Sequence, residues 1–212
     1  MSTEKKRFLT PKGRLLYPNL FYPKKPMENS PKEKFSGIIL FDKSAQKDPR
    51  FKEVLQGIQG AVKDEWPKKA PIGLKLPIKK GDRLKNKETG EFWPGCDEDT
   101  VAFSFQSDFA PEIFNQVKKK LKVGSPEDEA QIYGGCYVHI TVTPKAINMQ
   151  ENKCVTMYLG NVMKVAEGEP IGGGRVSADK DFEDIEEIEV EVDVSDLHED
   201  ETSEDDPLAD LA

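Results

Sequence analysis

Cysteine and histidine, which build most disulfide and zinc sites, are scarce in this 212-residue chain, with three cysteines and two histidines. Cys96, Cys136 and Cys154 are far apart and odd in number, which favours reduced thiols in a cytoplasmic compartment over a disulfide framework. No Cys-x-x-Cys or His-x-x-x-His pair occurs, and His198 lies in an acidic stretch. The sequence therefore predicts no metal site.

The groups needed for catalysis or cofactor binding are also missing. Gly172-Gly173-Gly174 lacks the preceding strand and the Gly-Lys-Ser/Thr ending of a phosphate-binding loop. Cys136 and His139 fall on opposite faces of one predicted strand, so they cannot pair as nucleophile and base. We interpret the run Asp97-Glu98-Asp99 as a solvated acidic turn in preference to a metal site. We therefore expect neither an enzyme nor a cofactor, and a hydrolase built from the Asp/Glu clusters is the least favoured alternative.

Long hydrophobic runs are absent as well. No stretch of about 18 apolar residues exists, so no membrane-spanning segment is predicted. The segment Met1 to Arg7 is polar and basic and has no apolar core, so no secretory signal is predicted. We expect a cytoplasmic protein.

The net charge of −8 hides two opposite parts. Residues 1–164 contain 29 Lys/Arg against 20 Asp/Glu, a balance of +9, whereas residues 165–212 contain 2 against 19, a balance of −17. A basic body suits a polyanionic partner. From Glu183 onward there are 15 acids and no Lys or Arg. Because like charges repel and few apolar groups can be buried there, we expect residues 183–212 to form a disordered acidic tail.

Hydrophobic periodicity predicts a mainly β chain with one amphipathic helix. Asp48 as N-cap and Pro49 at the first helical position begin the helix, and Trp66-Pro67 ends it. Its buried face carries Phe51, Val54, Leu55, Ile58 and Val62. Strands are predicted over residues 34–42, 100–107 and 154–165, the last with a bulge at Gly160-Asn161. A short strand at 74–76, a turn at 124–129 and a loop at 144–153 are also expected, and residues 111–123 fit either a helix or a strand.

The clearest strand signal runs from Ile132 to Val142. Its alternation places Cys136, Val138, Ile140 and Val142 on one face, and Tyr133, Tyr137 and His139 on the other. Flat rings on an outward sheet face can stack the bases of a single strand. The alternative is that these rings pack under a loop.

Two further stretches combine cations with aromatic rings. Residues 14–25 read as an extended strand because prolines at 18, 23 and 26 exclude a long helix. Their alternative interpretation is an edge strand with lysines that reach out to solvent, and residues 79–87 could equally be a solvated charged loop. The candidate nucleic-acid contacts are Arg14, Tyr17, Phe21, Lys24, Lys79, Lys80, Arg83, Lys85, Lys87, Trp93, Tyr133, Tyr137, His139 and Tyr158.

Five motifs occur in an order that resembles a known family. They are Tyr17-Pro-Asn-Leu-Phe21-x-Pro-Lys24, Lys80-Gly81-Asp82, Tyr133-x-Gly135-Cys136-Tyr137-Val138, Leu159-Gly-Asn161-Val162-x-Lys164-Val165-x-x-Gly168-Glu169-Pro170-x-Gly172-Gly173 and Ala178-Asp-Lys-Asp181-Phe182. Over roughly residues 14–182 the chain resembles the phage-type single-stranded DNA-binding proteins, first catalogued as a family of unknown function. These are similar in plan to the T7-like single-stranded DNA-binding protein. The chain departs from that pattern in Asn152-Lys153-Cys154 and in a long tail that ends in Leu211-Ala212.

The resemblance implies an OB-like five-stranded barrel without catalysis, binding of single-stranded DNA, and an acidic C-terminal tail. We therefore expect a flexible N-terminal arm over residues 1–12, an OB-fold domain over 13–182 and the tail over 183–212. The expected protein coats and protects single-stranded DNA in phage-type replication or recombination, in the host cytoplasm if a phage encodes it. Its tail is expected to regulate binding and to recruit replication proteins, and a homodimer is compatible with the sequence. The alternative is an acidic-tailed protein-interaction adaptor that binds no nucleic acid.

Overall fold

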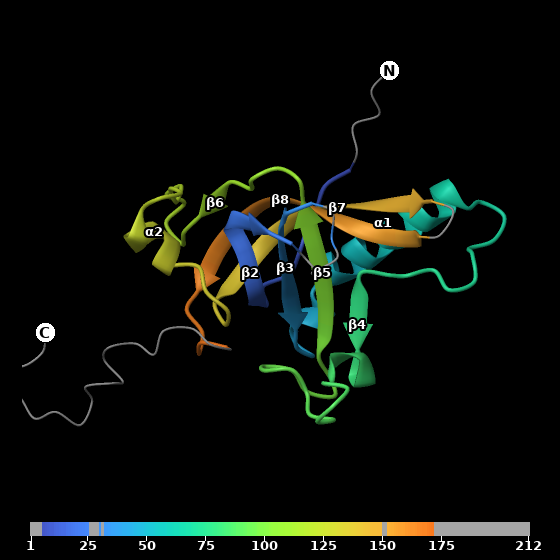
Figure 1. Cartoon of the computed structure of the whole chain (residues 1–212), viewed down its shortest axis with the longest axis horizontal. Helices are drawn as coiled ribbons and strands as arrows, with labels where there is room; N and C mark the ends of the chain where they lie inside the picture. The colour runs from blue at the N-terminus through green and yellow to red at the C-terminus, as the bar shows by residue number, and fades with distance from the viewer. Residues whose placement is uncertain (1–5, 26–29, 31, 150–151, 172–212) are drawn as a thin grey trace, which may run out of the picture. The chain divides into compact units, whose positions relative to one another are not determined.

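The computed structural model of the chain describes residues 6–25, 30, 32–149 and 152–171. These residues lie within one compact unit, and they are mainly β as predicted (Figure 1). The strands are β1 (Phe8–Leu9), β2 (Gly13–Lys24), β3 (Lys34–Phe41), β4 (Ile78–Lys80), β5 (Val101–Ser107), β6 (Ile113–Phe114), β7 (Tyr137–Asn148) and β8 (Lys153–Ala166). The helices are α1 (Pro49–Glu65), α2 (Pro126–Ala130) and the 3-10 turns η1 (Ala45–Lys47) and η2 (Gly81–Leu84).

Five of the strands pair in a closed circuit. β2 pairs with β3, β3 with β5, β5 with β8, β8 with β7, and β7 again with β2. Every link is antiparallel except β5–β8, which joins Gln106 to Tyr158 in parallel. This circuit agrees with the OB-like arrangement that the resemblance implies. The circuit contains the expected five strands, and three short strands pair with its members: β1 with β7, β4 with β5 and β6 with β8.

The first of these added strands changes the expected N-terminal arm. β1 pairs Phe8 with Val142 and Leu9 with Thr141, and Thr10 is fully buried. Residues 8–12 therefore belong to the folded unit, contrary to the predicted flexible arm over 1–12. The sequence does not predict β1, because a strand of two residues is too short to show the alternation of apolar and polar side chains.

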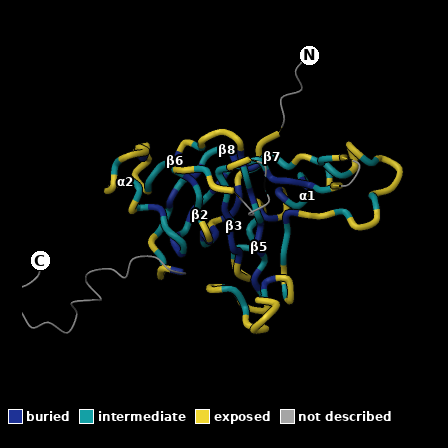
Figure 2. Tube along the Cα trace, in the orientation of Figure 1, coloured by how far each residue is buried: buried dark blue, intermediate teal, exposed yellow. Residues whose placement is uncertain are grey.

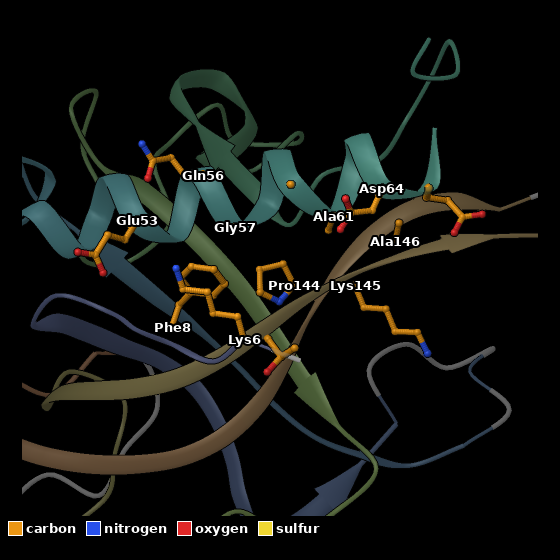
Figure 3. A pocket seen from close by; sticks show the side chains of 13 residues that line it. Lys6, Phe8, Glu53, Gln56, Gly57, Ala61, Asp64, Pro144, Lys145 and Ala146 are labelled. Atoms are coloured by element: carbon orange, nitrogen blue, oxygen red, sulfur yellow. The ribbon is translucent and has the colours of Figure 1, made fainter. Parts of the chain in front are cut away.

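Helix α1 has the predicted boundaries and the predicted N-cap, in which the Asp48 side chain accepts a hydrogen bond from the Arg50 amide. The helix lies against β1 and β7. The ring of Phe8 packs beneath Gly57 (Figure 3). A Cβ atom at Gly57 would lie 2.6 Å from that ring, so a side chain there would displace Phe8. No helix in the described part of the chain is long and apolar enough to cross a membrane.

The main core fills the inside of the strand circuit. The Phe41, Phe51 and Phe103 rings lie 5.0 to 5.4 Å apart and join α1 to β3 and β5. A second, smaller cluster lies on the outer face of β2, β3 and β5, where Leu16, Leu40 and Ala102 pack against Leu84 and Ile171. In Figure 2 the buried residues concentrate in the strands, and the loops that connect them are mostly exposed. The second cluster fixes the position of the loop that follows β4.

Several predicted boundaries differ from the structure. β7 begins at Tyr137 and not at Ile132, and it continues to Asn148 through the segment predicted as a loop. Residues 111–123 form only the short strand β6 and a turn, and the predicted turn at 124–129 contains the start of α2. The strand predicted at 74–76 is a single bridge from Lys75 to Cys154. The predicted bulge in β8 is confirmed, because the register with β7 shifts at Gly160-Asn161.

Candidate nucleic-acid interface

Six of the fourteen predicted contact residues line one groove of about 810 Å³. We call this hollow the Trp93 groove. Its lining includes the predicted residues Tyr17, Lys79, Arg83, Lys85, Lys87 and Trp93. Asp82, Glu88 and Glu91 also line it, so cations exceed acids there by four to three. The fold brings these residues together from β2, β4 and the segment 81–94.

The wall of the Trp93 groove is held by a buried anchor. Leu84 at the end of η2 is fully buried in the second cluster, against Leu16 and Leu40. Beyond it, the Trp93 amide donates to the Leu84 carbonyl at 2.7 Å, and the Asn86 amide donates to the Glu91 carbonyl at 2.7 Å. This charged loop is therefore packed on the outer face of the sheet, and its cations project from a fixed frame.

Tyr17 reaches the groove from an irregular point of β2. The register between β2 and β3 shifts between Leu16 and Asn19, and Tyr17 has a φ of 49° with 53% of its surface exposed. A left-handed backbone is costly for a residue with a side chain, and more so before a proline, here Pro18. Strain of this kind persists where the surroundings enforce it, and it is found most often at functional sites. The bulge turns an aromatic ring outward beside the cations of the loop.

The cations lie against aromatic rings. The Lys79 ammonium is 4.5 Å from the centre of the Trp93 ring, and the Lys85 ammonium is 4.9 Å from that of Phe92. Such contacts favour a positive charge over the ring face. Burial lowers the pKa of Lys79, whereas the hydrogen bond from Lys85 lowers the pKa of Asp82. The groove thus combines flat apolar surfaces with positioned positive charges, which is the chemistry that bases and phosphates require.

A family model described as the single-stranded DNA-binding protein of Enterobacter phage Enc34 matches residues 6–194. The chain belongs to this family. The solved structure of the bacteriophage Enc34 single-stranded DNA-binding protein in complex with single-stranded DNA is similar, with a TM-score of 0.64 and 24% identity over 78% of this chain and 89% of that one. The bacteriophage T7 single-stranded DNA-binding protein gp2.5 is similar in fold, with a TM-score of 0.51 and 18% identity over 86% of this chain and 96% of that one. No curated protein matches the sequence.

This family is one of DNA-binding proteins and not of enzymes, as the sequence analysis expects. In this member the acidic turn is structural. Asp97 accepts hydrogen bonds from Thr100 and from the Asp99 amide, and Asp99 pairs with Lys43 at 2.7 Å. Among the described residues no group of three or more His, Cys, Asp or Glu side chains could hold a metal ion. Burial raises the pKa of the Cys96 thiol to about 11, so this thiol stays protonated at neutral pH.

Four predicted residues from β2 and β4 lie outside the Trp93 groove. The Arg14 guanidinium donates to the Glu169 carbonyl at 2.6 Å and to the Gly135 carbonyl at 3.3 Å, so it ties two segments of the protein together. Lys80 is exposed at the end of β4. Phe21 packs partly against the main core, and Lys24 is exposed at the end of β2.

Each of the predicted rings Tyr133, Tyr137 and His139 contacts another part of the protein. Tyr133 precedes β7, and its hydroxyl lies 2.8 Å from a Glu167 carboxylate oxygen and 2.9 Å from the Gly168 carbonyl. His139 Nδ1 lies 2.8 Å from the Thr10 carbonyl. Tyr137, with the Lys12 ammonium 5.2 Å from its ring centre, lines a separate hollow that also contains three aspartates, Asp42, Asp48 and Asp97. Base stacking by these three rings stays a prediction.

Tyr158 lies on β8, beside the outer face of β5. It is the cross-strand partner of Gln106, and the Lys145 ammonium is 5.8 Å from its ring centre. The sequence analysis did not select Phe92, although it precedes Trp93 directly and carries the Lys85 contact. Two adjacent aromatic residues after a cationic loop were the available signal.

Proposed function

We propose that this protein binds single-stranded DNA in the Trp93 groove, without strong sequence preference, and coats and protects it during phage-type replication or recombination. The observation that carries this proposal is the meeting of Tyr17 and Trp93 with Lys79, Arg83, Lys85 and Lys87 in one groove. The family membership and the similarity to a structure solved with single-stranded DNA support it.

The chemistry of the groove fits single strands better than duplexes. Unstacked bases can lie on the exposed ring of Tyr17 and on the half-buried ring of Trp93, whereas paired bases hide their faces in the helix. The surrounding cations attract phosphates, which carry no sequence information. Most of the groove-lining side chains are therefore suited to contacts that every nucleotide offers.

The acidic tail lies outside the described residues and belongs to the same proposal. Its 15 acids from Glu183 onward suit competition with DNA for the cations of the body. When DNA displaces the tail, the tail becomes available to other replication proteins. The place of action would be the cytoplasm of the infected host cell.

A titration of the full chain with oligo-dT at low and moderate salt tests the proposal. We expect tight binding at low salt that weakens steeply as salt rises, because phosphate binding releases counterions. A duplex of the same length is the matched control and should bind more weakly. Absence of binding at low salt would overturn the proposal and favour the protein-interaction adaptor.

A further inference from the structure

Another exposed aromatic side chain lies at the opposite end of β5 from the Trp93 groove. Phe109 is 83% exposed, just past the last residue of β5, Ser107. In Figure 1, β5 runs from the end that holds η2 and the following loop toward the segment that leads into β6. Seven residues of strand span about 20 Å. Phe109 therefore lies well beyond the groove but within reach of a site of about 4 to 16 nucleotides.

The turn that presents Phe109 is anchored. The Phe109 amide donates to the Ser107 hydroxyl at 3.0 Å, and Ser107 itself is buried. The next side chain toward the strand, Asp108, pairs with Lys34 of β3 at 3.6 Å. The ring is thus held in solvent by a fixed turn. Single exposed apolar residues are common, so exposure alone does not identify a site.

A second observation at the same end points to an anion. Lys24 of β2 and Lys34 of β3 are direct cross-strand partners. Like charges in that arrangement destabilise a sheet. Asp108 offsets one of them, and no ion pair within the described residues reaches Lys24. A bound phosphate would relieve the repulsion between the two ammonium groups.

The surface between the two ends is suitable for a continuous strand. Ile38 of β3 packs against the second cluster, as Phe92 and Trp93 do, so the groove lies beside the outer face of β3 and β5. Along that face the cross-strand pairs are Ile38–Ser104 and Ser36–Gln106, all half-buried and none acidic. A polyanion meets no repulsive charge along these two rows.

We propose that Phe109 stacks a base and that Lys24 and Lys34 bind phosphate at a second contact point, so that the bound strand runs from the Trp93 groove along β3 and β5 to this end. The inference rests on the proposed function and extends it beyond the groove. Phosphate would take the place of Asp108 as the partner of Lys34. Oligonucleotides long enough to reach Phe109 bind its ring as well, whereas short ones held in the groove do not.

The test compares oligo-dT of about 4 and about 16 nucleotides on the full chain. Phe109→Ala should weaken binding of the long oligomer by about 5- to 150-fold, the range for removal of one stacking ring, and leave the short one unchanged. Trp93→Ala should weaken both. Val117→Ala is the matched control, because Val117 is also apolar and 79% exposed, and it should change neither. Phe109→Trp should preserve long-oligomer binding.

Lys24→Gln gives an independent readout of the phosphate contact. It should lower the salt slope for the long oligomer by about 0.7, with no loss of thermal stability, since it removes a like-charge pair. Unchanged long-oligomer affinity in Phe109→Ala would overturn the inference and leave the groove intact. Equal weakening of both oligomers, or a changed oligomeric state in sedimentation without DNA, would also overturn it. If the unaltered protein binds neither oligomer, the proposed function itself fails.

Discussion

The Lys79 ammonium and the Trp93 ring face each other at 4.5 Å, although they come from a strand and a loop separated by η2. The contact holds the lysine at the mouth of the groove and leaves part of the indole accessible. A base that stacks on Trp93 would lie beside a positive charge that can bind its phosphate. This pair is therefore the part of the groove where stacking and charge are expected to act together.

Trp93→Ala is the first variant to make. We expect single-strand affinity to fall by about 1 to 3 kcal/mol, the usual effect of removing one base–aromatic stack. Trp93→Phe is the matched control, because it keeps a ring and should recover most of the affinity. Because Trp93 also packs on the second cluster, the melting temperature must be measured in parallel. An unchanged affinity with a lowered melting temperature would mean that the ring only supports the fold.

Tyr17 offers a prediction in which stability and binding change in opposite directions. Tyr17→Gly removes a strained left-handed residue, so the free energy of unfolding should stay level or rise by up to about 1 kcal/mol. The same change removes the exposed ring, so DNA affinity should fall by about 1 to 3 kcal/mol. Tyr17→Ala separates the two effects, because it removes the ring and keeps the strain. Denaturant titration and oligo-dT binding measure the two quantities, and retained affinity in both variants would exclude Tyr17 from the site.

The cations of the loop are expected to bind phosphates. Neutralising Lys85 and Lys87 together to glutamine should lower the dependence of log affinity on log salt by about 0.7 for each phosphate that is no longer neutralised. Lys68→Gln with Lys69→Gln is the matched control, since these two exposed lysines lie outside the groove, in the segment that follows α1. A fall in affinity at constant slope would show that the loop acts through structure and not through counterion release.

Helix α1 and the bulge in β8 could be predicted because their signals are local. An N-cap, a proline and a 3.6-residue period fix the helix, and Gly160-Asn161 marks the bulge. The run 132–142 misled because it reads as one strand. Gly135 has a φ of +114°, and a Cβ there would overlap the Glu169 carbonyl, so the chain turns before β7 begins. A contact 34 residues away is invisible to periodicity.

Pro144 led to the opposite error, a loop predicted where β7 continues, because proline usually interrupts a sheet. It lies past Val142, the last residue of β7 that pairs with β1, so within the described residues β7 has only β8 as a partner there. A missing amide hydrogen is tolerated on such an edge.

In the candidate site, the amino-acid composition was enough to find the cationic loop. The register shift that turns Tyr17 into the groove depends on pairing with β3, and the position of Tyr133 before the start of β7 depends on Gly135.

Tyr133→Phe tests the structural role of the Tyr133 hydroxyl. The hydroxyl bonds to Glu167 or Gly168, so its removal should cost about 0.5 to 1.5 kcal/mol of stability, the net value of such a hydrogen bond. The ring remains, so DNA affinity should not change. Chemical denaturation and oligo-dT titration of the same preparation measure both. Weakened DNA binding at unchanged stability would show that the Tyr133 hydroxyl contacts DNA.

Truncation after Phe182 tests the tail. The 15 acids that it removes carry no compensating cation, and the body to which they are tethered is basic. A tethered segment acts at millimolar effective concentration, so it can compete for the groove even if its intrinsic affinity is weak. We expect the truncated protein to bind oligo-dT more tightly than the full chain at low salt. The gain should shrink as salt rises, because screening weakens the attraction between tail and groove. Trp93→Ala in both backgrounds is the control, and it should weaken binding with and without the tail. Equal affinities of the two forms at low salt would rule out competition and leave the tail as a ligand for partner proteins or a solubilising segment.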